Sequence, residues 1–372
     1  MSYLGSEIKK LGFGLMRLPM IGEEIDIEQV KTMVDAYMAK GFTYFDTAYV
    51  YGGGKSELAA KAAIVDRYPR ESFQLATKLP LWNVEDAAEM QKLFDVSMER
   101  TGAGYFDFYL LHSLSRTVVD RLDKLGAWDF MKKLKEEGKV KHIGFSFHDT
   151  AEMLDELLTA HPEMDFVQLQ INYADWESEN VQSRKCYEVA RKHNKPIIIM
   201  EPVKGGSLAT MTPQVQKMFK DANPDASVAS WAVRFAASHE GIITVLSGMS
   251  NTEQMNDNMS YMENFQPLNE AEMKVIDEVV EVLNNTPTIP CTECRYCVDG
   301  CPMKINIPKI FRDAMNYVSV YGNEQQGKGR YNRATKDGGK ASECLHCGNC
   351  EMHCPQHIEI MNLLEKAAEM FE

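Results

Sequence analysis

Eight of the nine cysteines in this chain fall into two short runs near its C-terminus. Each run has the spacing C-x2-C-x2-C-x3-C and is followed directly by proline. The first run is Cys291, Cys294, Cys297 and Cys301, and the second is Cys344, Cys347, Cys350 and Cys354. Loops of two residues allow three thiolates to wrap one iron–sulfur cube, and this spacing is typical of proteins that hold two [4Fe-4S] clusters. The spacing therefore predicts two [4Fe-4S] clusters and a redox protein.

The fourth cysteine of such a run, ahead of proline, binds the cube of the other run in two-cluster proteins. We therefore expect shared ligation, with ligation inside each run as the alternative. One cluster then takes Cys291, Cys294, Cys297 and Cys354, and the other takes Cys344, Cys347, Cys350 and Cys301. Zinc is the rival metal, because paired C-x2-C motifs also build four-thiolate zinc sites. The Cys-Pro that closes each run favours iron–sulfur.

Four titratable residues stand at or just beyond the ends of short apolar runs in the first part of the chain. They are Asp46, Tyr51, Lys78 and His112. Each taken alone has a structural explanation, because a tyrosine usually packs, a strand-end lysine is usually solvated and a histidine after apolar residues usually lies in the core. A phenol, an ammonium, a carboxylate and an imidazole in one place can move a proton. Whether they meet depends on the elements that carry them.

The sequence alternates eight short apolar runs, rich in β-forming residues, with longer amphipathic stretches. The runs cover residues 10–18, 43–47, 73–78, 106–112, 141–147, 166–172, 196–202 and 243–248. Helix candidates include residues 28–40, 84–101, 151–161, 179–193 and 252–263. The alternation predicts a parallel sheet, and eight strand–helix units without G-x-G-x-x-G after the first strand favour a (β/α)8 barrel over an open doubly wound sheet. In such a barrel the C-terminal strand ends meet at the face where active sites gather.

A break at residues 284–290, rich in Asn, Thr and Pro, divides the chain after a last helix at 269–284. We predict a barrel domain over residues 1–285 and a small, mainly helical iron–sulfur domain over residues 286–372. Within the second domain, residues 307–321 have a helical pattern. Residues 322–340 are rich in glycine and charge, which predicts a mobile or irregular loop.

Composition restricts the partners of the protein. With 40 Lys and Arg against 54 Asp and Glu, the formal net charge of −14 repels nucleic acids and anionic membranes. No apolar run approaches the length of a membrane-spanning helix, and the first ten residues lack the apolar core of a signal peptide. Clustered cysteines are also unlike a disulfide framework. We therefore expect a cytoplasmic protein that binds neither nucleic acid nor membrane.

Several motifs of the first domain are similar to those of the aldo-keto reductase family. They are Gly12-Phe-Gly-Leu-Met-Arg17, the turn Asp46-Thr-Ala-Tyr-Val-Tyr51-Gly52, the strand-end Lys78 and Leu110-Leu-His112. The resemblance covers residues 1–285 and implies that Tyr51 is the general acid–base, that Lys78 and Asp46 are its partners, and that His112 orients the carbonyl. The second domain resembles the helical two-cluster ferredoxin domains.

The implied chemistry agrees with the residue types. A free tyrosine has a pKa of about 10 and is a poor proton donor to a developing alkoxide at neutral pH. The ammonium of Lys78 favours the phenolate of Tyr51, and Asp46 keeps that lysine charged and aimed. A neutral His112 can donate a hydrogen bond to the substrate oxygen as negative charge grows there. A nicotinamide supplies the hydride.

The resemblance also implies contacts to that cofactor. The residues concerned are Ser146, Gln168, Met200, Gly248, Gln254 and Asn258. Ser146 and Gln168 match the positions that bind the nicotinamide amide, and Asn258 matches one near the adenine. Met200 stands where many members stack an aromatic ring. Gly248 and Gln254 replace the basic residues that hold the 2′-phosphate in NADP-specific members, which favours NAD or weak nicotinamide binding.

These inferences lead to two main hypotheses about function. The first is an iron–sulfur aldo-keto reductase that acts on a small carbonyl or alcohol with NAD(P)(H) and relays electrons to ferredoxin or another carrier, with flavin as a further candidate cofactor. The second is an electron-transfer or redox-sensing adaptor with a slow or vestigial reductase site. In a third, the clusters only brace the C-terminal segment. Substrate and oligomeric state stay open.

Overall fold

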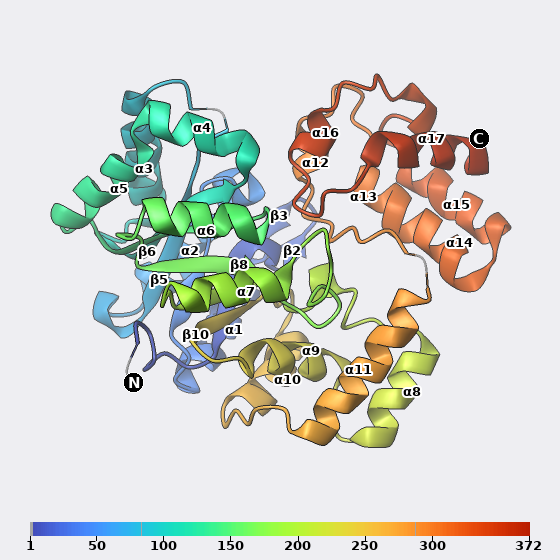
Figure 1. Cartoon of the computed structure of the whole chain (residues 1–372), viewed down its shortest axis with the longest axis horizontal. Helices are drawn as coiled ribbons and strands as arrows, with labels where there is room; N and C mark the ends of the chain where they lie inside the picture. The colour runs from blue at the N-terminus through green and yellow to red at the C-terminus, as the bar shows by residue number, and fades with distance from the viewer. Residues whose placement is uncertain (1–2, 83, 287) are drawn as a thin grey trace. The chain divides into compact units, whose positions relative to one another are not determined.

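The computed structural model describes residues 3–82, 84–286 and 288–372 and contains a closed barrel of eight parallel strands. Its strands are β1 (Leu11–Gly14), β4 (Tyr44–Asp46), β5 (Gln74–Pro80), β6 (Phe106–Leu114), β7 (Val140–Phe147), β8 (Phe166–Gln170), β9 (Ile197–Met200) and β10 (Ile242–Ser247). Each strand pairs with the next along the chain, and β10 pairs with β1 to close the barrel. The predicted (β/α)8 barrel is confirmed (Figure 1).

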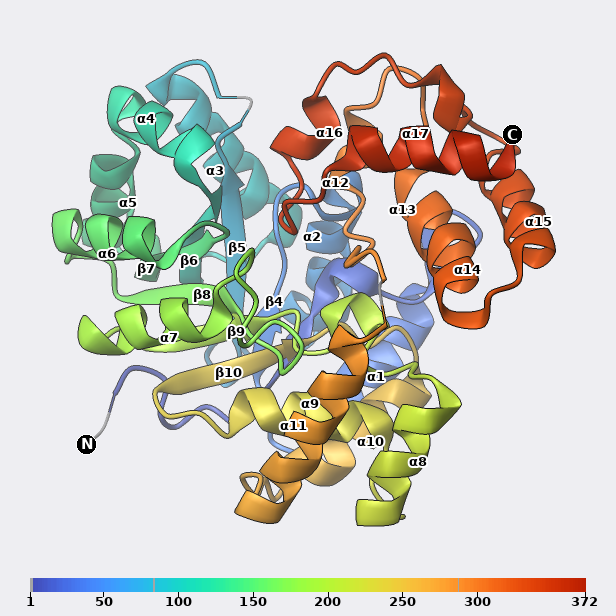
Figure 2. The same ribbon diagram turned by 45° about the vertical axis from the view of Figure 1, so that its right-hand side comes forward.

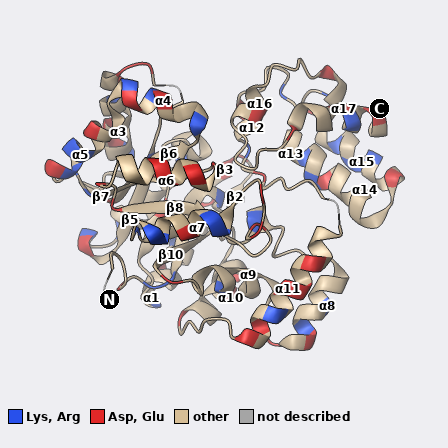
Figure 3. Cartoon of the chain, viewed as in Figure 1, with Lys and Arg blue, Asp and Glu red and all other residues tan. Residues whose placement is uncertain are grey.

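Helices cover the outside of the barrel, as a parallel sheet requires. They include α1 (Ile27–Ala39), α2 (Lys55–Ala60), α3 (Ala87–Thr101), α4 (Arg116–Leu125), α5 (Ala127–Glu136), α6 (Ala151–Ala160), α7 (Ser183–Lys192), α9 (Val228–Ala237) and α10 (Thr252–Met262). Several begin at a side chain that accepts a hydrogen bond from the backbone amide three residues further on, for example Asp26 at α1 and Asn251 at α10. Figure 3 shows acidic and basic residues on outer helices such as α5 and α7, while the strands are mostly uncharged.

The interior of the barrel is filled by side chains that alternate along the strands. Its buried core consists of Ile8, Tyr44, Ala76, Phe108, Leu110, Phe166, Ile198, Ile243 and Leu246. Successive side chains of a strand point to opposite faces, so the residue two positions after a core residue also faces the barrel axis. This alternation fixes which strand-end residues face the centre of the barrel.

A small hairpin before α1 was not predicted. Strands β2 (Met20–Ile21) and β3 (Glu24–Ile25) pair antiparallel with two residues between them. Met20 is 53% exposed and Ile21 is 69% exposed, so this hairpin leaves apolar side chains in solvent. Strands of two residues give too short an alternation to be recognised in a sequence.

The chain divides into two compact units. One consists of Met1–Val203 with Asn223–Met273, and the other of Lys204–Ala222 with Lys274–Glu372. The second unit therefore includes α8 (Pro213–Ala222) and most of α11 (Glu270–Asn284). The domain boundary expected at residue 285 stays a prediction.

The C-terminal part of the second unit is helical. Its longer elements are the π-helical turn η6 (Ile310–Met315), α14 (Asn316–Tyr321), α15 (Glu324–Ala334) and α17 (Ile360–Phe371), and the short ones are α12 (Tyr296–Asp299), α13 (Ile307–Lys309) and α16 (Asn349–Met352). They pack around their own core, which includes Phe311, Tyr331 and Phe371. The helical pattern at 307–321 is thus confirmed across α13, η6 and α14.

The prediction of a mobile or irregular loop at residues 322–340 is wrong, because α15 occupies residues 324–334 of that segment. Its sequence is too polar and too rich in glycine to show a helical pattern. The helix is stabilised instead by Asn323, whose side chain accepts from the amide of Gln326, and by Tyr331, which is buried in the core. A Cβ on Gly327 would lie 2.3 Å from Val318 Cγ2, so glycine allows α15 to approach α14 closely. Tertiary packing here overrides a weak helix propensity.

Within the described ranges, no helix combines the length and the apolar composition needed to cross a bilayer.

Candidate functional site

Five of the ten predicted barrel-site residues share one structural position. They lie two residues after an inward-facing core residue of the same strand. The pairs are Tyr44 and Asp46, Ala76 and Lys78, Leu110 and His112, Phe166 and Gln168, and Ile198 and Met200. The site therefore forms the layer above the apolar core, at the C-terminal ends of the strands. Figure 2 shows β4 and β5, which carry Asp46 and Lys78, side by side in the barrel.

Asp46 and Lys78 form a buried ion pair at this end of the barrel. Lys78 Nζ lies 2.6 Å from Asp46 Oδ1 and also donates to the backbone oxygen of Thr47 at 2.7 Å. Burial lowers the pKa of Lys78, and the carboxylate of Asp46 opposes that shift. Burial likewise raises the pKa of Asp46, and Lys78 opposes it. The pair therefore depends on both partners, since either charge alone would be buried without compensation.

Tyr51 reaches the same place from the loop after β4. It opens the turn η2 (Tyr51–Gly54), in which Gly54 has a φ of 92°. A Cβ on Gly54 would lie 2.6 Å from the guanidinium carbon of Arg100. Arg100 in turn donates to the backbone oxygen of Tyr49 at 3.1 Å, and this hydrogen bond fixes the chain just before the turn. With this turn in place, Lys78 Nζ lies 4.9 Å from the centre of the Tyr51 ring.

His112 completes the group from the end of β6. Its ring centre lies 5.9 Å from that of Tyr51, and the two rings are nearly perpendicular at 79°. Burial, followed by the nearby charges of Lys78 and His148, holds the pKa of His112 well below its usual value. His112 is therefore a neutral imidazole at pH 7 and can act as a hydrogen-bond donor without carrying charge. The structure thus brings together the four residues predicted from the sequence.

Sequence reasoning missed Trp82 at this site. Its ring centre lies 5.2 Å from that of His112, with the planes tilted by 56°. Trp82 comes two residues after the end of β5 at Pro80, and an aromatic residue so close to a strand end was the available signal. It adds an apolar wall beside the polar group.

Three predicted cofactor residues lie at neighbouring strand ends, on β7, β8 and β9. Ser146 Oγ accepts a hydrogen bond from the amide of Ser113 at 2.7 Å. Gln168 Nε2 contacts the sulfur of Met200 at 3.4 Å. Gln168 Oε1 is buried and has no hydrogen-bond partner among the described residues. A buried amide oxygen in this state can accept a hydrogen bond from a water molecule or a bound ligand.

The other three predicted cofactor residues lie around the end of β10 and the start of α10. A Cβ on Gly248 would lie 3.5 Å from Arg17 Cδ, so the side chain of Arg17 borders the space left by this glycine. Gln254 is exposed, and its Oε1 accepts from the amide of Ser250 at 2.8 Å. Asn258 is buried and donates to Ser247 Oγ at 2.6 Å.

In the second unit, the cysteine runs form tight turns. Non-glycine residues between the cysteines adopt left-handed backbone conformations, with φ of 57° at Glu293, 69° at Arg295 and 52° at His346. Each such residue costs of order 1 kcal/mol or more, so the surrounding structure must impose these turns. In the second run, all three of Cys344, Cys347 and Cys350 face one cavity.

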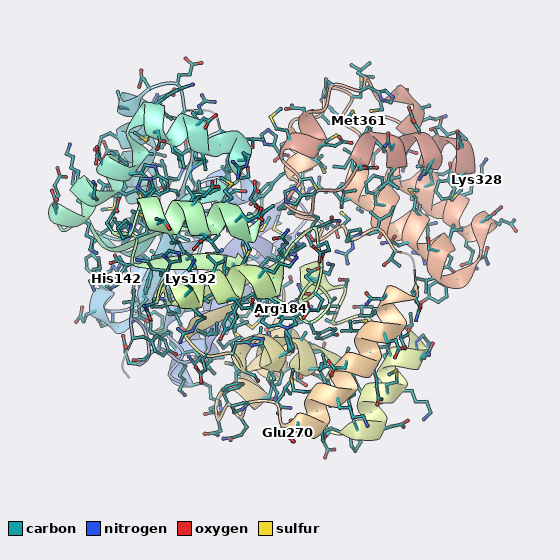
Figure 4. The ribbon with its side chains drawn as sticks, in the orientation of Figure 1. His142, Arg184, Lys192, Glu270, Lys328 and Met361 are labelled. Atoms are coloured by element: carbon teal, nitrogen blue, oxygen red, sulfur yellow. The ribbon has the colours of Figure 1, made fainter. Side chains whose placement is uncertain are left out.

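Four of the thiols line a single cavity. Cys301 of the first run lies there with Cys344, Cys347 and Cys350 of the second. The rest of the wall is mainly apolar and includes Ile305 and Met361, the latter labelled in Figure 4. Across the described ranges, no group of three or more His, Cys, Asp or Glu side chains is gathered closely enough to hold a single metal ion.

The thiols of the other group lie near Cys297, which is buried. Burial, and then the neighbouring thiols of Cys294, Cys291, Cys354 and Cys350, raises the pKa of Cys297. Burial also raises the pKa of Cys350 to about 11. These thiols are therefore protonated at pH 7 in the absence of metal, and binding iron to them releases protons.

Both parts of the chain match models of known protein families. Residues 10–281 match the model of the aldo/keto reductase family, and residues 290–359 match that of a 4Fe-4S dicluster domain. A probable aldo-keto reductase from Glycine max is 34% identical over 181 residues, which are 46% of this chain and 50% of that protein. The 9,11-endoperoxide prostaglandin H2 reductase of Trypanosoma cruzi is 27% identical over 277 residues, covering 72% and 89%. This chain thus spans about half the length of the soybean relative.

Solved structures share the barrel fold. The holo form of an aldo-keto reductase from Bacillus halodurans has a TM-score of 0.61 at 21% identity and covers 75% of this chain and 95% of its own. An aldo-keto reductase from Klebsiella pneumoniae in complex with NADPH has a TM-score of 0.60 at 20% identity, covering 73% and 91%. Because the family match extends across the barrel, from before β1 into α11, this chain belongs to the aldo/keto reductase family.

Proposed function

We propose that this protein is an iron–sulfur oxidoreductase that transfers hydride between a nicotinamide cofactor and a small carbonyl or alcohol. One observation carries the proposal. Lys78 is held 2.6 Å from Asp46 and 4.9 Å from the centre of the Tyr51 ring, in a layer that also contains the neutral His112. These groups together suit proton transfer to and from an oxygen atom.

In the direction of reduction, Tyr51 gives its phenolic proton to the carbonyl oxygen as hydride reaches the carbonyl carbon. The product is an alcohol and a phenolate. The ammonium of Lys78 stabilises that phenolate, and Asp46 keeps the ammonium in place. His112, as a neutral donor, holds the carbonyl oxygen where negative charge develops. Alcohol oxidation runs through the same contacts in reverse.

The nicotinamide itself supplies the hydride when bound. The chain offers a fitting partner for its carboxamide group, because Gln168 Oε1 is buried and lacks a hydrogen-bond partner in the described part of the chain. Ser146 lies on the adjacent strand β7. Met200 contacts Gln168 through sulfur, so a flexible thioether takes the place of a stacking aromatic ring. Asn258 and Gln254 complete the proposed adenosine end.

The choice between NAD and NADP depends on charge near Gly248. Neither Gly248 nor Gln254 carries a cation for a 2′-phosphate, which supports NAD. Arg17 borders Gly248, and its guanidinium is the basic group that the phosphate of NADP would call for. Direct titration with both nucleotides decides between them.

The second unit is proposed to bind two [4Fe-4S] clusters, which carry single electrons when bound. Cys301, Cys344, Cys347 and Cys350 surround one cavity, which supports shared ligation. Cys347 is exposed whereas Cys297 of the other group is buried. The cluster at Cys347 is therefore the better placed one for exchange with ferredoxin or another carrier. A hydride carries two electrons, so a flavin, which handles both one and two, is the candidate intermediary.

An electron-transfer or redox-sensing adaptor is the second proposal, supported by the presence of a complete cysteine set in the same chain as a reductase barrel. Anaerobic spectroscopy on cluster-loaded protein distinguishes the two. In the relay proposal, NADH or NADPH reduces the clusters and bleaches their visible absorption. Carbonyl reduction with clusters that stay oxidised contradicts the relay, and cluster reduction without carbonyl turnover favours the adaptor.

A further inference from the structure

The helical segment after the first cysteine run holds that run from one side. Asn316 accepts from the amide of Ile289 at 2.7 Å and donates to its carbonyl at 2.9 Å. Arg312, four residues earlier, lies 3.4 Å from the carboxylate of Glu293, between the first two cysteines. The backbone on both sides of Cys291 is therefore fixed to η6 and α14.

Arg312 also holds a segment distant in sequence. Its Nη1 donates to the backbone oxygen of Gly205 at 2.9 Å. Gly205 lies directly against the cysteine loop, since a Cβ there would be 2.1 Å from the oxygen of Thr292. Its φ of 62° also favours glycine. The guanidinium of Arg312 thus bridges Gly205 and Glu293 within the second unit.

The segment around Gly205 is the direct continuation of barrel strand β9. Met200, the last residue of that strand, contacts Gln168 of the proposed nicotinamide site. Beyond Gly205 the loop is closed by its own hydrogen bonds, from the amide of Ser207 to Lys204 and from the amide of Thr210 to Gly206, each at 3.2 Å. Hydrogen exchange of these amides therefore measures whether the loop is fixed in place.

The charge of Arg312 reaches the first cysteine as well. Its partner Glu293, 3.4 Å from the guanidinium, stands two residues after Cys291 and directly before Cys294. Reduction adds negative charge to a cluster, so a cation beside one of its thiolates favours the reduced form.

We propose that Arg312 is a positioning residue that couples the two redox parts of the chain, by fixing the loop after β9 to the first cysteine run and by placing a positive charge beside the cluster bound there. The inference rests on the proposed binding of clusters. It names Arg312 as the residue through which a change at the first cysteine run alters the loop after β9, the chain segment that leaves the proposed nicotinamide site.

The test uses full-length, cluster-loaded protein under anaerobic conditions. In Arg312→Gln, the amides of residues 204–210 should exchange with deuterium roughly tenfold faster or more, as expected for the loss of a hydrogen bond from a charged donor. The midpoint potential of one cluster, followed by EPR during a redox titration, should become more negative. Arg312→Lys keeps the charge and should restore the potential while the loop still exchanges faster.

The matched control is Arg330→Gln, which removes an arginine stacked on Tyr317 in the same unit, 4.1 Å from its ring centre. It should change neither measurement. Iron and sulfide analysis of each variant separates this inference from the proposal of clusters, because protein without iron and sulfide contradicts cluster binding itself. The coupling role is contradicted if Arg312→Gln keeps its full iron and sulfide and yet matches the wild type in either loop exchange or midpoint potential.

Discussion

Lys78 Nζ lies 2.6 Å from Asp46 Oδ1, and both side chains are almost fully buried. The charge of the ammonium beside Tyr51 is therefore balanced by a carboxylate on the neighbouring strand β4. Breaking a buried pair by removing one partner typically costs about 3–5 kcal/mol. The ion pair therefore links the stability of the barrel to its proposed chemistry.

Asp46→Asn should lower both the thermal midpoint of the barrel and carbonyl turnover, because it leaves the lysine charge unbalanced. The double variant Asp46→Asn with Lys78→Met removes both charges and should recover much of the stability but none of the turnover. Thermal unfolding and steady-state rates measured on the same preparations check this. Recovery of turnover in the double variant would contradict the role of Lys78.

Tyr51→Phe removes the proposed acid–base hydroxyl and keeps the ring. Carbonyl turnover should fall by about 10²–10⁴-fold, the usual contribution of a positioned acid or base. Nucleotide affinity should stay nearly unchanged, as measured by equilibrium titration. Tyr49→Phe is the matched control, since its ring stacks with Arg100 and Phe keeps the ring. Full turnover in Tyr51→Phe rules out the acid role.

The pKa of His112 predicts a simple pH dependence. Because its pKa is held well below 6.5, His112 takes up no second ring proton as the pH falls from 8 to 6, and it stays a neutral donor throughout. The kcat/KM of carbonyl reduction should therefore show no acid limb near pH 6.5. His112→Gln should reduce kcat/KM by a similar factor at every pH in this range. An acid limb near pH 6.5 in the wild type that disappears in His112→Gln is inconsistent with a neutral imidazole.

Shared cluster ligation is tested by comparing pairs of cysteine variants. Cys347→Ser can affect only the cluster of the second run, and Cys294→Ser only that of the first. Under shared ligation the EPR spectrum of reduced Cys301→Ser should resemble that of Cys347→Ser, and Cys354→Ser should resemble Cys294→Ser. The opposite pattern supports ligation within each run. Zinc without acid-labile sulfide in oxygen-protected protein contradicts both.

The position of the catalytic candidates could be predicted because it depends on a regular property of the chain. Asp46, Lys78 and His112 stand at the ends of apolar strands, and in a barrel all such ends meet. The position of Tyr51 could not be predicted from a strand end alone, because three glycines with left-handed backbone angles after it determine where its ring lies. Its place came from the similarity of the whole turn to a known family.

Other features depend on packing between distant segments and left little trace in the sequence. Helix α15 is polar and contains glycines, and it forms because Tyr331 is buried and Gly327 admits a neighbouring helix. The contact between Arg312 and Gly205 joins residues 107 positions apart. A single sequence carries no periodicity that would indicate such a pair.

Hydride transfer itself is tested most directly with cofactor deuterated at carbon 4 of the reduced nicotinamide. Anaerobic incubation of the cluster-loaded protein with labelled NADH or NADPH and a panel of small aldehydes and ketones should give at least one alcohol with deuterium on the carbinol carbon, and Tyr51→Phe should suppress it. Alcohol formed without deuterium at that carbon, or labelled equally fast by Tyr51→Phe, would contradict the proposed reductase site.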